Sequence, residues 1–344
     1  MFETPIESLM ETKLPLRCRA DGKFRLLVLS DLHGGVGCSE QMFTGIEETV
    51  AAVKPDLVLL NGDTAGPGRI HVETPEQLGA LLDRAAAPME SRGIPWCHVF
   101  GNHDDNFGVS NAEAQKVYES YAHCVSKAGE SFMSGVGNYV LPVYSHSGEA
   151  VVGAVWGFDS HSGMAEFSRE FGLPEDTRYV LPQHAFQGRG YDTLHVNQVL
   201  WYYTASIRLE QYCGKKVPGV MCFHIPLPEF VLCCRNRDET DFEGSEGENV
   251  GCGEMNSGVF QAILERGDVK AVCCGHDHIN DFSAVYCGVK LCYDGGMDYD
   301  AYQRDEIRGG RVFEFDENDP QNIRTYMAHI KDIMGVRGNK IRRG

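Results

Sequence analysis

The fold is decided by the stretch Val269-Lys-Ala-Val-Cys-Cys274, which is followed directly by Gly275-His276-Asp277-His278. The apolar run predicts a short buried strand, and the two histidines follow its end. In open α/β sheets, side chains beyond the carboxyl ends of strands converge on one crevice, where ligands bind. A single His-x-His pair also fits an exposed loop or strand. The meaning of this pair therefore depends on the rest of the chain.

Four other predicted strands also run into residues that commonly bind metals. They are Phe24–Leu29 before Asp31 and His33, Asp56–Leu60 before Asp63, Ile94–Phe100 before Asn102, His103 and Asp104, and Val217–Phe223 before His224. Each residue alone has another explanation: an aspartate caps a helix, Asn102 makes a turn, and His224 is a satisfied core histidine. Five strand ends with the same chemistry favour a common site.

Helical patterns separate these strands, which predicts βαβ units around a buried sheet. The expected helices are Met42–Val53, Thr74–Arg92, Asn111–Lys127, Thr193–Cys213 and Ser257–Arg266. A β-hairpin is expected from Tyr139–Tyr144 and Ala150–Phe158, and the last strands from Val289–Tyr293 and Arg311–Phe315. The polar segment Ser160–Arg189 is interpreted as a loop.

Composition narrows the class of protein. The chain has 344 residues and a formal net charge of −18, and such an acidic surface opposes nucleic-acid binding. Met1–Pro15 does not resemble a signal peptide, and no stretch reaches the roughly 18 apolar residues of a membrane span. The 13 cysteines, without a C-x-x-C pair, indicate buried thiols in a reduced compartment. We expect a cytoplasmic protein that does not bind membranes.

The candidate ligands combine carboxylate, imidazole and amide oxygen. This mixture suits Mn, Fe or Zn better than calcium or copper(I). One ion takes about four to six ligands, so the set is large enough for two divalent ions sharing a carboxylate. Such a pair brings the pKa of a bound water near neutrality, and the resulting hydroxide can attack phosphorus in line.

The motif series Asp31-x-His33, Gly62-Asp63, Gly101-Asn102-His103-Asp104, His224 and Gly275-His276-x-His278 resembles that of the calcineurin-like metallophosphoesterases, in the same order. Flanking residues resemble the purple-acid-phosphatase-like branch that lacks the metal-binding tyrosine. Gly66 stands where purple enzymes have that tyrosine, and His33 where they have glycine. The resemblance implies an α/β/β/α sandwich of two mixed sheets, and one domain over 1–344. Its core would span about 24–315, with an N-terminal extension, 1–23, and a C-terminal tail, about 316–344.

The resemblance also implies roles for individual residues. Asp31, His33, Asp63 and His278 would bind the first metal, and Asn102, His224 and His276 the second, with Asp63 bridging. His103 would contact the phosphate and assist the leaving group, and Asp104 would orient His103. Arg69, His71, Phe107 and His195 are guesses at pocket lining.

The expected function is therefore hydrolysis of phosphomonoesters by a dinuclear metal centre. A phosphodiesterase of the same fold is the near alternative, and a non-catalytic binding or scaffold protein is the alternative from another class. The expected substrate is a phosphorylated small molecule or a phosphoprotein. The sequence leaves the oligomeric state and the native metal pair open.

Overall fold

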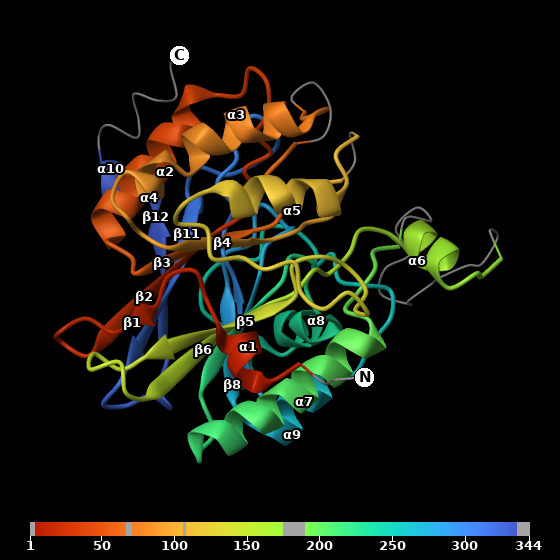
Figure 1. The fold of residues 1–344 in the computed structure, drawn as a ribbon. Helices are drawn as coiled ribbons and strands as arrows, with labels where there is room; N and C mark the ends of the chain where they lie inside the picture. Colours follow the sequence, from red (N-terminus) through yellow and green to blue (C-terminus); the bar gives the residue numbers. More distant parts are fainter. Residues whose placement is uncertain (1–3, 67–70, 106–107, 175–189, 336–344) are drawn as a thin grey trace.

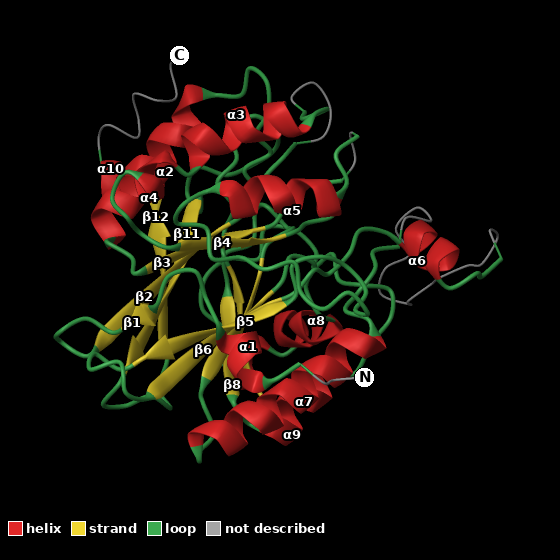
Figure 2. Ribbon diagram, in the orientation of Figure 1, coloured by secondary structure: helices red, strands yellow, loops and turns green. Residues whose placement is uncertain are grey.

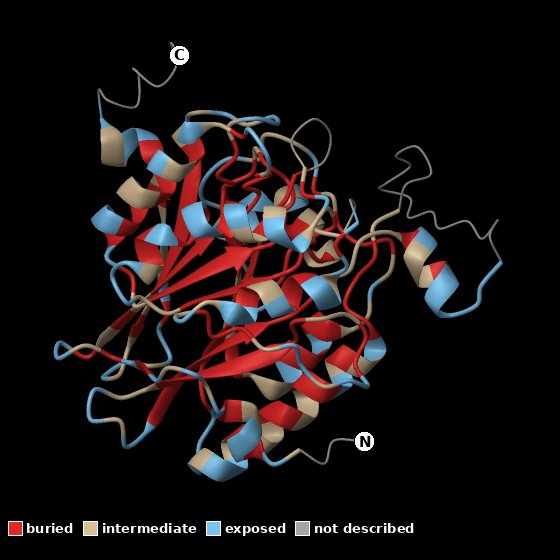
Figure 3. Ribbon diagram, turned by 45° about the horizontal axis from the view of Figure 1, so that its top comes forward, coloured by how far each residue is buried: buried red, intermediate tan, exposed pale blue. Residues whose placement is uncertain are grey.

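The computed structural model describes residues 4–66, 71–105, 108–174 and 190–335. Two β-sheets pack against each other, and helices cover their outer faces (Figures 1 and 2). The central strands are buried, whereas the helices expose their outward sides (Figure 3). This is the predicted α/β/β/α sandwich of two mixed sheets. The expectations for Arg69, Phe107 and the end of the tail lie outside the described residues.

The first sheet has five strands, in the order β12-β11-β2-β3-β4. Their bounds are β2 Lys23–Leu29, β3 Leu57–Asn61, β4 Trp96–Val99, β11 Gly309–Asp316 and β12 Arg324–His329. Strands β2, β3 and β4 run parallel, and β11 and β12 are antiparallel to their neighbours. Edge strand β12 is absent from the sequence-based prediction, because four of its six residues are polar or small and only one is buried.

The second sheet has seven strands, in the order β1-β5-β6-β7-β8-β10-β9. Their bounds are β1 Leu16–Arg17, β5 Tyr139–Tyr144, β6 Val151–Gly157, β7 Gly219–Cys222, β8 Val269–Cys274, β9 Ser283–Tyr286 and β10 Val289–Tyr293. The predicted hairpin is confirmed as the antiparallel pair β5 and β6. Strands β6, β7, β8 and β10 are parallel, so β7 and β8 deliver their carboxyl ends to the same edge.

Helices form the two outer layers. The five-stranded sheet is covered by α2 Glu40–Val53, α3 Pro75–Ala85, α4 Ala87–Glu90, α5 Asn111–Ser120 and α10 Ile330–Met334 (Figure 1). The seven-stranded sheet is covered by α1 Ile6–Met10, α7 Val196–Cys213, α8 Pro228–Arg235 and α9 Val259–Arg266 (Figure 1). One apolar core lies under each helical layer, and a third lies between the sheets.

Three helix predictions need correction. The expected helix Thr74–Arg92 is divided at Ala86 into α3 and α4, where Pro88 in the first turn of α4 has no N–H to continue the ladder. The helix expected to reach Lys127 ends at Ser120. The segment interpreted as a loop contains α6, Met164–Glu170, which extends to one side of both layers (Figure 1).

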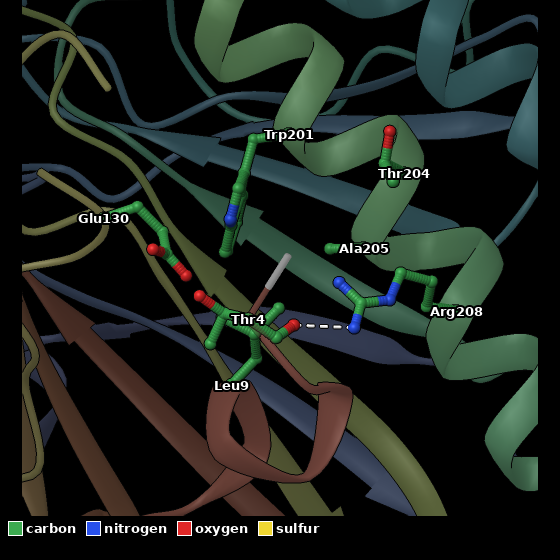
Figure 4. A pocket seen from close by; sticks show the side chains of 7 residues that line it. All are labelled: Thr4, Leu9, Glu130, Trp201, Thr204, Ala205 and Arg208. Atoms are coloured by element: carbon green, nitrogen blue, oxygen red, sulfur yellow. Dashed lines mark hydrogen bonds between the residues drawn. The ribbon is translucent and has the colours of Figure 1, made fainter. Parts of the chain in front are cut away.

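The N-terminal segment packs against α7. The Arg208 guanidinium donates to the carbonyl oxygen of Thr4 at 2.6 Å, and Trp201 lies beside this contact (Figure 4). The cavity between them has a volume of about 10 Å³. This volume holds at most one water molecule, so it is no substrate site. Among the described residues, no helix is both long and apolar enough to cross a bilayer.

Candidate metal centre

The seven predicted ligands follow strand ends at one edge of the sandwich, and both sheets supply them. Asp31 and His33 follow β2, Asp63 follows β3, Asn102 follows β4, His224 follows β7, and His276 and His278 follow β8. All seven are buried. Six of these side chains, up to 247 positions apart in the chain (278 − 31), therefore come together in two groups, as the strand-end argument predicts; Asn102 is not among the six.

The side chains form two adjacent groups, and within each group the possible ligand atoms lie within 4.8 Å of one another. The first group is Asp31, His33 and His278, and the second is Asp63, His224 and His276. In the first, the Nε2 atoms of the two histidines are 2.9 Å apart. In the second, His224 Nε2 is 3.2 Å from Asp63 Oδ2. Each group draws on both sheets.

Asp63 connects the two groups. Its Oδ2 lies 3.2 Å from His224 Nε2 in the second group and 3.7 Å from His33 Nε2 in the first. Its Oδ1 accepts a hydrogen bond from the backbone N–H of His103 at 2.9 Å. One carboxylate therefore faces both groups while the backbone holds its other oxygen, which is the position a bridging ligand needs.

Hydrogen bonds fix which nitrogen of two histidines faces the centre. His224 Nδ1 lies 2.8 Å from the Asn61 carbonyl oxygen, and His278 Nδ1 lies 2.9 Å from that of Tyr302. A carbonyl can only accept, so Nδ1 carries the proton in each neutral ring and Nε2 presents its lone pair. Metal-binding histidines have this second hydrogen bond in most proteins.

Buried atoms without hydrogen bonds face the same place. Asp31 Oδ1 and His224 Nε2 are buried and have no hydrogen-bond partner, although they lie 3.7 Å apart. Leaving such atoms unsatisfied is costly, and a cation between them would satisfy both. The donor set and its orientation therefore fit a bound metal.

The backbone at the site is held in a conformation that non-glycine residues rarely adopt. Asp31, His33, Asp63 and His276 have φ values of 49°, 45°, 49° and 77°. Left-handed backbone costs free energy at each residue and clusters at functional sites. It is tolerated here because the surrounding strands and hydrogen bonds fix the loops.

Two glycines allow the loops to approach one another. A Cβ atom at Gly101 would lie 2.2 Å from Asp63 Oδ1, and one at Gly275 would lie 2.6 Å from Ser30 Oγ. Neither position tolerates a side chain without moving a candidate ligand or the residue beside it. The glycines next to the ligand motifs are therefore explained by close packing.

The charges of the site depend on one another. Burial lowers the pKa of His224, but the carboxylates of Asp63 and Asp31 outweigh it and raise that pKa to about 10. Burial opposes ionisation of Asp63, yet His224 and His33 hold its pKa well below the usual range. Burial, followed by the charge of His224, lowers the pKa of His276 to about 3. In the metal-free protein, the proton on His224 thus balances the negative charge of the carboxylates that a metal ion would otherwise balance.

His103 and Asp104 lie at the edge of this cluster. The His103 ring is 5.7 Å from that of His33, centroid to centroid. The Asp104 carboxylate accepts hydrogen bonds from the backbone N–H groups of Asp63, Ala65 and Gly101 at 2.8–3.0 Å. These contacts fix the loops that carry the ligands. The expected action of Asp104 on the His103 ring stays a prediction.

Sequence reasoning missed the hydrogen-bonded residues that hold the Asp31 carboxylate in place. Ser30 Oγ hydrogen-bonds both to Asp31 Oδ2 and to the buried carboxylate of Asp294. Asn61 Nδ2 donates to the other Asp294 oxygen at 2.9 Å. Asp294 follows β10 directly, so the rule that found the other strand-end residues would also have found it.

Two aromatic side chains missed by sequence reasoning flank the centre. Tyr302 stacks on His278, with centroids 4.3 Å apart and planes at 5°, and its hydroxyl contacts the Glu248 carboxylate. Tyr191 lies edge-on to His276 at 4.3 Å. Tyr302 lies in a loop and follows no strand directly, so the motif search had no signal for it.

Two guesses at pocket lining can be placed. His71 Nε2 lies 3.0 Å from the Glu73 carboxylate near the molecular surface. His195 is buried in another cluster, with His161 and Asp192. The structure therefore does not bring these two histidines into either group of predicted metal ligands.

Comparison with known proteins agrees with this geometry. The family model described as calcineurin-like phosphoesterase matches residues 24–280. "Probable inactive purple acid phosphatase 28" of Arabidopsis thaliana is 30% identical, covering 88% of this chain and 77% of its own length. "Phosphatase DCR2" of Saccharomyces cerevisiae is 28% identical over 80% of this chain and 48% of its own.

A solved structure shares the fold at low sequence identity. It is a dimetal phosphatase from Danio rerio, 11% identical, with a TM-score of 0.51 and coverage of 88% of this chain and 98% of that one. The family match covers most of the chain and includes every predicted ligand. The chain thus belongs to the calcineurin-like phosphoesterases, in the purple-acid-phosphatase-like branch that lacks the metal-binding tyrosine.

Proposed function

We propose that this protein is an active phosphomonoesterase with two divalent metal ions. The observation that carries the proposal is the pair of buried ligand groups joined by Asp63. Asp31, His33, Asp63 and His278 would hold one ion, and Asn102, His224 and His276 the other. When bound, the two ions would supply positive charge for the phosphate and an ionised water for in-line attack.

The remaining steps fall to side chains of the chain itself. His103 is proposed to donate a proton to the leaving oxygen, since histidine is the side chain that most often acts as a general acid. Asp104 is proposed to keep the ligand loops in place through its three backbone hydrogen bonds. The proposed substrate is a phosphorylated small molecule or a phosphoprotein.

A non-catalytic role is the second candidate, because three relatives carry the words "probable inactive" in their names. Their names also contain "purple acid phosphatase", and the missing tyrosine separates this chain from purple enzymes. The missing tyrosine would supply only one ligand, and the imidazole of His33 can take its place in the first group. The ligand set of this chain therefore supports activity.

The test is hydrolysis of an aryl phosphate by the metal-stripped protein after reloading with Mn²⁺, Zn²⁺ or Fe²⁺. Metal-dependent turnover is expected, with a smaller rate on an aryl phosphodiester. His224→Ala should lose turnover, whereas the control His123→Ala, whose ring pairs with Glu90 elsewhere, should retain it. A protein that holds two metals per chain but hydrolyses neither ester would instead support the binding or scaffold role.

A further inference from the structure

A loop between α8 and α9 lies against the motif that supplies His276 and His278. Within this loop, the backbone N–H of Gly247 donates to the carbonyl oxygen of Ile279 at 3.1 Å. A Cβ atom at Gly247 would lie 2.3 Å from the same oxygen, so a larger residue would push the two segments apart. The loop is therefore built to approach the motif closely.

The side chain of Glu248 uses both of its oxygens at this contact. Its Oε1 accepts a hydrogen bond from the backbone N–H of Ile279 at 3.0 Å, directly after His278 in the chain. Its Oε2 accepts from the hydroxyl of Tyr302 at 3.0 Å. The backbone N–H of Glu248 donates to Asn280 Oδ1 at 3.1 Å, which fixes the glutamate itself. One carboxylate thus joins two residues that adjoin His278.

Tyr302 in turn restrains the His278 imidazole in two ways. Its carbonyl oxygen lies 2.9 Å from His278 Nδ1, which sets the direction of Nε2. Its ring stacks on the imidazole, with centroids 4.3 Å apart and planes at 5°, which limits tilting of the imidazole. His278 Nε2 consequently lies 3.4 Å from Asp31 Oδ1 in the first ligand group.

The hydrogen bond to Glu248 matters because burial does not hold the Tyr302 ring. This residue is 50% exposed, and exposed side chains change rotamer within nanoseconds unless a contact restrains them. A ligand that is already ordered when the ion arrives costs less free energy on binding than a mobile one. A link that orders Tyr302 therefore also favours metal binding by His278.

We propose that Glu248 and Tyr302 are positioning residues, which hold the His278 imidazole for the first metal ion and so set the affinity of that ion. Neither side chain is proposed to bind the ion. Hydrogen-bonded residues behind metal ligands change metal affinity by about 10–100-fold. The proposal rests on the dinuclear centre of the proposed function, but not on its turnover.

The contacts of the second ligand group predict that the effect is selective. His224 is held by the carbonyl oxygen of Asn61 at 2.8 Å, and His276 lies edge-on to the ring of Tyr191. Neither of these two contacts passes through the positioning residues of His278. Loss of those residues should therefore weaken one ion much more than the other.

The test is a Zn²⁺ titration of the metal-stripped full chain against a competing chelator, which gives two dissociation constants. Glu248→Ala should weaken one ion by about 10–100-fold and the other by much less. Glu248→Gln should bind nearly as the wild type does, because an amide can accept from the Ile279 N–H and donate to the Tyr302 hydroxyl oxygen. Glu243→Ala, an exposed glutamate of the same loop, is the matched control and should change neither constant.

A milder variant separates the hydrogen bond from the rest of Tyr302. Tyr302→Phe keeps the stacked ring and the backbone carbonyl but loses the bond to Glu248, so it should weaken the same ion by a smaller factor. Tyr212→Phe is its control, since Tyr212 on α7 is 53% exposed. With cobalt(II), the visible band that weakens in Tyr302→Phe should be the one that His278→Ala removes.

The outcomes distinguish this proposal from the proposed function. Unchanged affinity for both ions in Glu248→Ala and Tyr302→Phe would overturn it, and so would an equal loss at both ions. If circular dichroism shows that Glu248→Ala does not fold, Tyr302→Phe decides alone. A wild type that binds fewer than two ions would overturn the dinuclear centre together with this proposal. An inactive protein with two bound ions would contradict the proposed function only.

Discussion

His224 donates a hydrogen bond from Nδ1 to the backbone carbonyl oxygen of Asn61, 2.8 Å away. Asn61 ends β3 of the five-stranded sheet, whereas His224 follows β7 of the seven-stranded sheet. The acceptor is main chain, so substitution of the Asn61 side chain would not remove it. The ring is therefore held with Nε2 toward Asp63 by the fold itself. The packing of the two sheets therefore sets the orientation of the His224 ring.

Asp63→Asn should remove more metal than any other single ligand substitution, because Asp63 faces both groups. Elemental analysis is expected to give well below the two ions per chain of the centre. Asp268→Asn is the control, since this buried carboxylate contacts Tyr202 and Ser206 away from the site. Retention of both ions in Asp63→Asn would show that the carboxylate does not bridge.

His103→Ala should keep its metals and lose turnover by roughly 10²–10⁴-fold on alkyl phosphates, the usual contribution of a general acid. The loss on aryl phosphates should be much smaller, because a phenolate leaves without a proton. Steady-state rates on one ester of each kind measure this difference. Equal losses on both would leave His103 with a role in phosphate positioning alone.

The purified protein should be colourless or faintly coloured, and active with Mn²⁺ or mixed Fe and Zn. Loss of an anionic phenolate ligand weakens the preference for trivalent iron and removes its charge-transfer band. Tyr302 is the tyrosine to test, although its hydroxyl contacts Glu248. A strong visible band that disappears in Tyr302→Phe would contradict this prediction.

The wild type should gain stability relative to a Lys127→Met variant between about pH 8 and pH 10. Burial lowers the pKa of the Lys127 ammonium from 10.5 to about 8, and this group donates to the Leu9 carbonyl oxygen at 2.5 Å. Over this range the unfolded chain binds more protons than the folded one, so the free energy of unfolding increases with pH.

Urea denaturation of the wild type and Lys127→Met at pH 7.5 and 9.5 measures this effect. The wild type should gain stability relative to the variant at the higher pH. Lys215→Met, an exposed lysine beyond α7, is the control and should show no such relative change. A constant difference between wild type and Lys127→Met would show that the Lys127 ammonium is not destabilised by burial.

The sequence predicted the central strands and the residues after them because buried parallel strands are continuous apolar runs with polar ends. It did not predict β12, which is mostly polar, or α8, whose Pro228–Arg235 segment followed His224 too closely to suggest a new element. The roles of Tyr302 and Glu248 depend on contacts between distant segments. No local pattern in a single sequence reveals such contacts.

Each ligand group joins a residue of the five-stranded sheet to a residue of the seven-stranded sheet. A bound cation would therefore act as a cross-link between the halves of the molecule, and metal affinity would become part of the folding equilibrium. At a free metal concentration 100 times the dissociation constant, one such ion adds about 2.7 kcal/mol to the free energy of unfolding. Metal scarcity would thus lower the amount of folded protein as well as its turnover.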